Sequence, residues 1–171
     1  MSIPKRILNH LEKNKIKYDI IAHKTVYTAF DLANTTKSKL SDIAKTLLIK
    51  ADSRYVLVVV PAHYKLDFAK VKKVLKAKKV EIAKEGIMKS KFKVKPGAIT
   101  PFGTLHKTEV VIDNALKKTG KMVIGAGSFV ESLRMKVKDL ADLEEAKFAA
   151  IGARAQAPGV PKRPKTKKKS K

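Results

Sequence analysis

Two strongly apolar segments give the clearest pattern in the first half of the chain. Residues 43–50 read Ile-Ala-Lys-Thr-Leu-Leu-Ile-Lys, and the second segment is rich in valine. Runs of this length and composition are typical of buried β-strands, so we predict strands over residues 44–51 and 55–60. The polar residues 52–54 between them predict a hairpin, and Pro61 is expected to end the second strand.

Shorter segments with helical or strand-like spacing fill the rest of the chain. Ser2 is placed to cap a first helix that ends near Asn14, Asp67 to cap another, and Asp139 to cap the last. Further strands are predicted at residues 18–22, 80–83, 109–113, 121–125 and 133–137, helices at 28–34, 84–90 and up to 148, and loops at 35–41 and 95–103. The order lacks the regular alternation of a doubly wound sheet. We therefore expect an α+β fold with a mixed, strongly curved, barrel-like sheet surrounded by helices.

The length of 171 residues suggests one domain with a tail. Apolar periodicity stops near the end, so we expect a domain over residues 1–152 and a disordered tail over residues 153–171. Three prolines support this boundary. The basic residues expected to bind RNA from the tail are Arg154, Lys162, Arg163, Lys165, Lys167, Lys168, Lys169 and Lys171.

The charge of the chain is strongly positive. The formal net charge is +24, from 39 Lys and Arg against 15 Asp and Glu. Without the eight basic residues of the tail, 31 basic and 15 acidic residues remain, a net charge of +16. This balance favours a polyanionic partner, most simply nucleic acid. A solvated lysine-rich surface is the alternative interpretation.

Several classes of chemistry lack their sequence signals. The chain has no cysteine, and its four histidines do not show the spacing of metal ligands. No nucleotide-cofactor motif and no recognisable catalytic triad is present. The sequence also lacks a signal-peptide pattern and a long apolar run. We therefore expect a cytoplasmic protein with no cofactor, no metal and no membrane association.

Lys45 is the first candidate for a functional residue. It stands at the start of an apolar strand, where burial of its charge is unfavourable without an anionic or polar partner. A lysine that reaches the surface through its flexible stem is the alternative. His23 ends a predicted strand and could reach a pocket, although a lone histidine at a strand end is more often structural or solvated. Asp113 is expected to be a turn residue.

Two glycine-containing segments, residues 96–103 and 125–128, are the other candidates. Glycine permits positive φ angles and close approach of a ligand to the backbone, whose N–H groups can bind a carbonyl oxygen or a phosphate. Tight turns without a ligand explain the same pattern.

The order of these motifs resembles the YbaK family over roughly residues 3 to 151. The segments that carry the resemblance are residues 23–29, 43–48, 55–61, 66–67, 77–80, 96–103, 111–113, 125–128 and 133–135. This family is similar to the editing domain inserted in bacterial prolyl-tRNA synthetases, and it acts as a trans-editing aminoacyl-tRNA deacylase. The resemblance therefore implies mischarged tRNA as substrate, with an aminoacyl-tRNA synthetase or the ribosome as further partners.

The resemblance also implies roles for individual residues. The functional lysine of the family falls on Lys45, and Ser132 occupies a position that is acidic in some members. The residues expected to line the substrate site are Thr46, His23, Thr28, Gly97, Pro101, Gly103, Gly125, Gly127, Ser128 and Ser132. The expected reaction is hydrolysis of the ester at the 3′-terminal adenosine, with Lys45 positioning the substrate. A non-catalytic RNA- or ribosome-binding protein of the same fold is the alternative.

Overall fold

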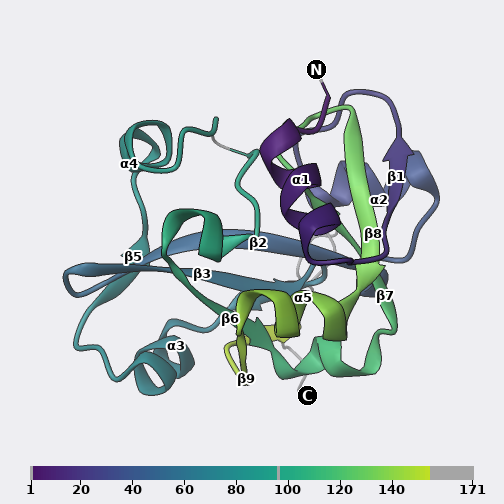
Figure 1. Ribbon diagram of the computed structural model, residues 1–171. Helices are drawn as coiled ribbons and strands as arrows, with labels where there is room; N and C mark the ends of the chain where they lie inside the picture. Colours follow the sequence, from purple (N-terminus) through teal and green to yellow (C-terminus); the bar gives the residue numbers. More distant parts are fainter. Residues whose placement is uncertain (1, 96, 155–171) are drawn as a thin grey trace, which may run out of the picture.

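The computed structural model describes residues 2–95 and 97–154 (Figure 1). Five α-helices are described: α1 (Lys5–Lys13), α2 (Ala29–Thr36), α3 (Phe68–Leu75), α4 (Glu85–Ser90) and α5 (Val137–Glu144). The strands are β1 (Asp19–Ala22), β2 (Ile43–Ala51), β3 (Arg54–Pro61), β4 (Tyr64–Leu66), β5 (Val80–Ile82), β6 (Glu109–Asp113), β7 (Lys121–Gly125), β8 (Glu131–Lys136), β9 (Lys147–Ala149) and β10 (Gly152–Arg154). Three short 3₁₀ helices lie between these elements: η1 (Leu40–Asp42), η2 (Gly103–His106) and η3 (Asn114–Lys118).

Eight of the strands form one mixed sheet. Seven follow the order β1-β8-β7-β2-β3-β6-β9, and β5 pairs with one end of β2. The predicted hairpin is the antiparallel pair of β2 and β3, whereas β2 runs parallel to β7 and β3 runs parallel to β6. This arrangement confirms the predicted α+β class with a mixed sheet. The strands β1 and β9 remain at the two ends of the order, so the sheet is not closed and the barrel-like shape is not confirmed.

Helices cover both faces of this sheet, which explains why β3 is apolar and buried from Val56 to Pro61. Leu57 and Val59 belong to a core shared with α1 and α5, and Val56, Val58 and Val60 belong to a second core under α3. Successive side chains of a strand point to opposite faces, so the two cores lie on opposite sides of the sheet. A third and smaller core under α2 contains Ile43 of β2 and Val123 of β7 beside it.

Several predicted boundaries agree with the structure because the local signals are strong. Asp67 caps α3 by accepting hydrogen bonds from the N–H groups of Ala69 and Lys70. Thr28 caps α2 in the same way and accepts from the N–H of Asp31. That helix continues to Thr36, two residues beyond its predicted end.

Two predicted caps are wrong. Pro4 occupies the N-cap of α1, and no side chain caps that end, so Ser2 does not have this role. Asp139 lies inside the first turn of α5, which begins after Lys136. The same helix ends earlier than predicted, because Glu145 adopts a left-handed conformation and the next residues form β9 beside β6.

The folded part of the chain extends slightly past its predicted boundary. Ala153 and Arg154 belong to β10, which pairs with β4 in a separate two-stranded sheet. These two residues were expected in the tail. The remaining tail residues, 155–171, lie outside the described part of the chain, so their disorder stays a prediction.

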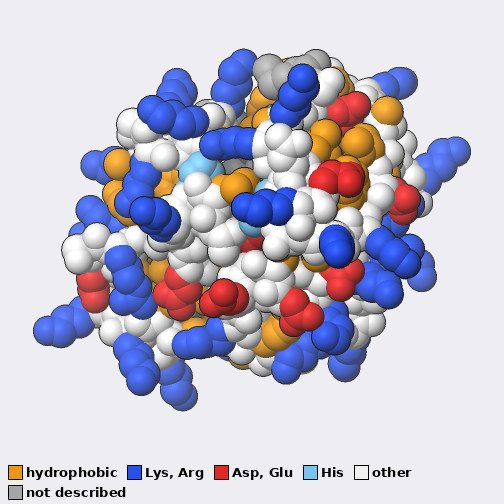
Figure 2. All heavy atoms as spheres, viewed as in Figure 1, with side chains coloured by type: hydrophobic (Ala, Val, Ile, Leu, Met, Phe, Trp, Pro, Cys, Tyr) orange, Lys and Arg blue, Asp and Glu red, His pale blue; other side chains and the backbone are white. Residues whose placement is uncertain are grey.

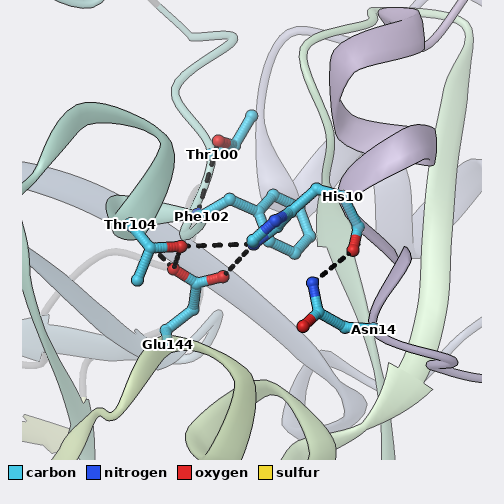
Figure 3. A network of polar contacts seen from close by, with 6 residues as sticks. All are labelled: His10, Asn14, Thr100, Phe102, Thr104 and Glu144. Carbon is cyan, nitrogen blue, oxygen red and sulfur yellow. Dashed lines mark hydrogen bonds and ion pairs between the residues drawn. The ribbon is translucent and has the colours of Figure 1, made fainter. Parts of the chain in front are cut away.

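A buried polar network connects α1, η2 and α5 (Figure 3). The Glu144 side chain is fully buried, and its carboxylate accepts from the backbone N–H and the hydroxyl of Thr104, at 2.7 and 2.8 Å. Its other oxygen lies 2.9 Å from Nε2 of His10. This network fixes the end of the 97–103 loop against two helices that are distant in sequence.

Candidate active site

A gap in the pairing of β2 creates the site. Along one edge, β2 pairs with β7 only at Ile43–Ala44 and with β5 only at Ile49–Ala51. The residues between these two contacts, 45–48, have no strand beside them on that edge in the described sheet. Beside this gap lies a cavity of about 310 Å³. Its walls come from the start of α2, from α4 and the segment up to Ile99, and from the turn between β7 and β8.

Lys45 lines this cavity and is half-buried. On its face of β2, Ile43 packs under α2 and Ile49 packs under α3, and Lys45 lies between them. Burial lowers the pKa of the Lys45 ammonium from its ordinary value of 10.5, and the positive charge of Lys65 lowers it further. Within residues 2–95 and 97–154, the ammonium has no ion pair and no hydrogen bond. An anionic ligand would offset both the burial of the ammonium and its repulsion by Lys65.

Thr46 adds polar groups to the same gap. Its side-chain hydroxyl is buried and has no hydrogen-bond partner among the described residues. The carbonyl of Leu48 accepts from Ala83 on the β5 side, and the carbonyl of Ile43 accepts from Ala62 on the opposite side. Because alternate residues of a strand direct their N–H and C=O groups to the same edge, those of Thr46 point into the gap.

Ser132 is buried in the cavity wall and is held by His23. Its Oγ lies 2.9 Å from Nε2 of His23, whose Nδ1 donates to the carbonyl oxygen of Lys24 at 2.7 Å. In the tautomer that carries the proton on Nδ1, Nε2 accepts a hydrogen bond from the Ser132 hydroxyl. No carboxylate is found among the described lining residues. The neighbouring Glu131 instead accepts from the backbone N–H of Ile3 at 3.0 Å.

The glycines of the two predicted loops have different surroundings. Gly97 and Gly125 line the cavity, and Gly97 has a positive φ of 87°. A Cβ on Gly127 would lie 3.1 Å from Pro4, so this glycine permits packing against the start of α1. A Cβ on Gly103 would lie 2.2 Å from the carbonyl oxygen of Thr108. This glycine therefore permits a close turn at η2.

The cavity collects most, but not all, of the predicted substrate residues. Those that line it are Thr28, Lys45, Thr46, Gly97, Gly125, Ser128 and Ser132. His23 is not a lining residue but contacts Ser132, and Pro101, Gly103 and Gly127 are also outside the lining. Asp113 is a structural turn residue as predicted, since its carboxylate accepts from the N–H groups of Ala115, Ile151 and Gly152.

The apolar and aromatic walls of the cavity are not among the residues predicted from sequence. Met88 of α4 and Ile99 line one side, and Tyr27 and Phe129 form a ring pair on another, with centroids 5.0 Å apart. The two aromatic residues stand directly beside motif residues, Tyr27 before Thr28 and Phe129 after Ser128. That adjacency was the only available signal.

The surface of the molecule is rich in cations. Figure 2 shows Lys and Arg side chains around the whole outline of one face, with fewer acidic side chains between them. Among the described residues, no group of His, Cys, Asp and Glu could hold a metal ion. No described helix combines the length and the apolar character needed to cross a bilayer.

Comparison with known proteins places the chain in a family. The sequence profile of the aminoacyl-tRNA editing domain matches residues 23–143, the part that contains Lys45, the gap in β2 and the cavity. The chain belongs to this family of YbaK-like editing domains.

The relatives include proteins of two different lengths. Proline–tRNA ligase of Macrococcus caseolyticus is 28% identical over 117 residues, which cover 68% of this chain and 20% of the ligase. The chain thus spans about a fifth of the length of that relative. Prolyl-tRNA editing protein ProX of Acetoanaerobium sticklandii is 27% identical, covering 68% of this chain and 74% of ProX. A solved structure of a proposed trans-editing enzyme for prolyl tRNA synthetase superposes with a TM-score of 0.77 at 19% identity, over 90% of this chain and 99% of the other.

Proposed function

We propose that this protein is a trans-editing hydrolase that removes a wrongly attached amino acid from tRNA. The observation that carries the proposal is Lys45, a half-buried cation without a partner among the described residues, beside the open edge of β2. Family membership and the similarity to prolyl-tRNA editing protein ProX support an aminoacyl-tRNA substrate. The similarity to proline–tRNA ligase supports a tRNA for proline, with the synthetase as a partner.

The reaction needs positioning more than a strong nucleophile. Water adds to the ester carbonyl carbon, the bond from that carbon to the ribose oxygen breaks, and the ribose oxygen takes a proton. The products are a free amino acid and a tRNA with a free terminal hydroxyl. An ester is already activated, so orientation and stabilisation of the developing oxyanion supply much of the rate enhancement. The resemblance to the family suggests that the 2′-hydroxyl of the tRNA and a water take part.

The groups in the gap fit these tasks. The Lys45 ammonium would hold the terminal phosphate or an oxygen next to the ester, where its charge favours the developing negative charge. The backbone N–H of Thr46 would donate to the ester carbonyl, and N–H groups near Gly97 would support it. The backbone carbonyl of Thr46 and the Ser132 hydroxyl would receive the amino group of the substrate, in the absence of a carboxylate among the described lining residues.

The walls of the cavity suggest which amino acids are removed. Apolar side chains such as Leu32, Met88 and Ile99 provide most of the lining, and no acidic residue is described there. A cationic side chain would therefore enter without a counter-charge, at high desolvation cost. We propose a small, uncharged aminoacyl group as substrate. Such a group needs editing because one methylene contributes only about 1–3 kcal/mol to binding by the synthetase. The synthetase therefore cannot fully exclude a slightly smaller amino acid, and a second pocket must remove it.

Deacylation assays with a panel of mischarged tRNAs test this proposal. Purified protein should hydrolyse at least one tRNA that carries a small neutral amino acid, and Lys45→Ala should not. If the protein binds tRNA but hydrolyses no member of the panel, the non-catalytic RNA-binding protein is the correct reading and the hydrolase is ruled out.

A further inference from the structure

Tyr27 is the most exposed large hydrophobic side chain in the described part of the chain. Its side chain is 67% exposed, compared with 40 to 45% for Ile20, Phe68 and Ile82. It packs on one side against Phe129, at a centroid distance of 5.0 Å and an interplanar angle of 51°. Both residues line the cavity beside Lys45. An apolar surface of this kind at the edge of a binding cavity is suited to a flat ligand.

This ring pair is held firmly in place. The N–H of Val26 donates to the carbonyl of Phe129, and the N–H of His23 donates to the carbonyl of Val130, both at 2.9 Å. Val26 is buried in the core under α2, and Thr28 caps that helix. The Tyr27 segment is thus fixed on both sides and is tied to the turn that carries Phe129. A platform prepared in this way loses little conformational entropy when a ligand binds.

The ring pair also borders the groups that are proposed to hold the ester. A Cβ on Gly97 would lie 3.5 Å from the Phe129 ring and 3.6 Å from the carbonyl oxygen of Tyr27. Gly97 therefore lies directly against the aromatic pair inside the cavity lining. A ligand whose reactive end lies beside Lys45 would extend its other end over these rings.

We propose that Tyr27 and Phe129 form a stacking platform for the unpaired adenine base at the 3′ end of the tRNA. The proposal rests on the proposed function, because the ribose that carries the ester also carries this base. Proteins hold unpaired bases by stacking them on aromatic side chains, and the contact tolerates solvent on the outer face. The exposed face of Tyr27 offers that contact, and it needs no polar partner.

Fluorescence of a modified tRNA tests the platform without any hydrolysis. An uncharged tRNA with 2-aminopurine as its 3′-terminal base should lose fluorescence on binding to the full-length protein, because stacking quenches this base. Tyr27→Phe keeps the ring and should retain the quenching, whereas Tyr27→Ala should remove most of it. Phe68→Ala is a matched control, since Phe68 is an exposed aromatic residue outside the cavity lining. Equal quenching by Tyr27→Ala and the parent protein would overturn the platform.

Kinetics give a second and independent readout. Tyr27→Ala should lower kcat/KM for the mischarged tRNA by roughly tenfold to a hundredfold, the range expected for loss of one stacked base. Its thermal unfolding should be close to that of the parent, because the side chain is mostly exposed. If the parent protein hydrolyses the substrate and Tyr27→Ala is unimpaired, only the platform is refuted. If the parent protein quenches 2-aminopurine but hydrolyses nothing, the platform stands and the proposed function fails.

Discussion

At Lys45, the requirements of folding and of the proposed chemistry oppose each other. The ammonium loses hydration through burial and gains no ion pair or hydrogen bond within the described residues. A group of this kind destabilises the free protein and becomes favourable only when a ligand supplies negative charge. Lys45→Met keeps the length and removes the charge. It should lower deacylation by at least about 10²-fold and raise the midpoint of thermal unfolding.

Parallel measurements of turnover and thermal unfolding check this pair of effects. Lys50→Met is the control, since Lys50 lies in the same strand but outside the cavity lining. It should change turnover little. Normal turnover by a folded Lys45→Met variant would exclude Lys45 from the reaction.

The lowered pKa of Lys45 predicts a pH dependence with a defined sign. Deacylation should fall as the pH rises through this pKa, below 10.5, because the ammonium loses its proton. Stability should change in the opposite direction. Between the lowered folded pKa and the unfolded value, the unfolded chain binds more protons, so the free energy of unfolding rises with pH in that window. Below the window, the destabilisation by Lys45 is fully present.

A pH–rate profile corrected for spontaneous ester hydrolysis measures this effect. Lys45→Arg keeps its charge at every accessible pH, so any residual activity of that variant should lack the alkaline decrease. An alkaline decrease of the same position and size in Lys45→Arg would assign the titration to another group.

Two glycines within one loop predict contrasting outcomes. Gly97→Ala places a Cβ at a positive φ, which costs about 1–2 kcal/mol, and narrows the space beside Phe129. This variant should lose activity per folded molecule. Gly103→Ala places a Cβ 2.2 Å from the carbonyl oxygen of Thr108, outside the cavity lining, so it should lose stability and keep its activity per folded molecule. Specific activity normalised to the folded fraction from circular dichroism distinguishes them, and the reverse pattern would contradict the geometry.

At the scale of elements, local signals predicted the fold well and long-range contacts decided the rest. The β2–β3 hairpin and the Asp67 cap follow from residues that are neighbours in sequence. The end of α5 does not, because residues 147–149 pair with β6, more than 30 positions away. An apolar residue such as Phe148 fits a helix face and a strand equally well. Only the position of β6 selects the strand.

The candidate site likewise contains some residues that local sequence signals reveal and others that only long-range contacts bring in. Lys45 and the glycine runs were visible because charge inside an apolar run and repeated glycine are unusual in sequence. The gap beside Thr46 depends on where β7 stops and β5 begins along β2, which no local pattern encodes. Tyr27 and Met88 join the cavity through tertiary packing, so they look like ordinary core residues in the sequence.

The network around Glu144 predicts how strongly three elements depend on one carboxylate. Glu144→Ala removes the acceptor for Thr104 and the partner of His10 in a buried setting. We expect a loss of about 2–4 kcal/mol in the free energy of unfolding. Urea denaturation measures it. Asp142→Ala is the control on the same helix, because its exposed pair with Lys138 should contribute about 0.5 kcal/mol or less. Equal effects of the two variants would show that the network does not stabilise the fold.

At the scale of the whole molecule, positive charge is the dominant feature, and part of it lies beyond β10. Deletion of residues 155–171 removes seven Lys and Arg residues and leaves that strand intact. If the tail binds the tRNA backbone, the deletion should raise KM, leave kcat little changed and flatten the salt dependence of KM. On duplex DNA, each phosphate contact contributes up to about −0.9 to the slope of the logarithm of the binding constant against the logarithm of the salt concentration.

Measurements of KM for the full-length and the truncated protein across about 50 to 200 mM salt test whether the tail binds tRNA. A tail with no part in substrate binding gives identical KM values and identical slopes. In that case, the positive charge that binds tRNA lies on the folded domain.

The gap in the pairing of β2 also predicts an unusual pattern of amide hydrogen exchange. The Leu48 carbonyl is occupied on the β5 side, and β7 pairs with Ile43–Ala44, but the Thr46 N–H between them faces the cavity. It should exchange with solvent deuterium faster than amides on either side of it in the same strand. A substrate analogue whose carbonyl accepts this N–H would slow the exchange. One backbone proton in the middle of the sheet would then report whether the site is occupied, without any label or substitution.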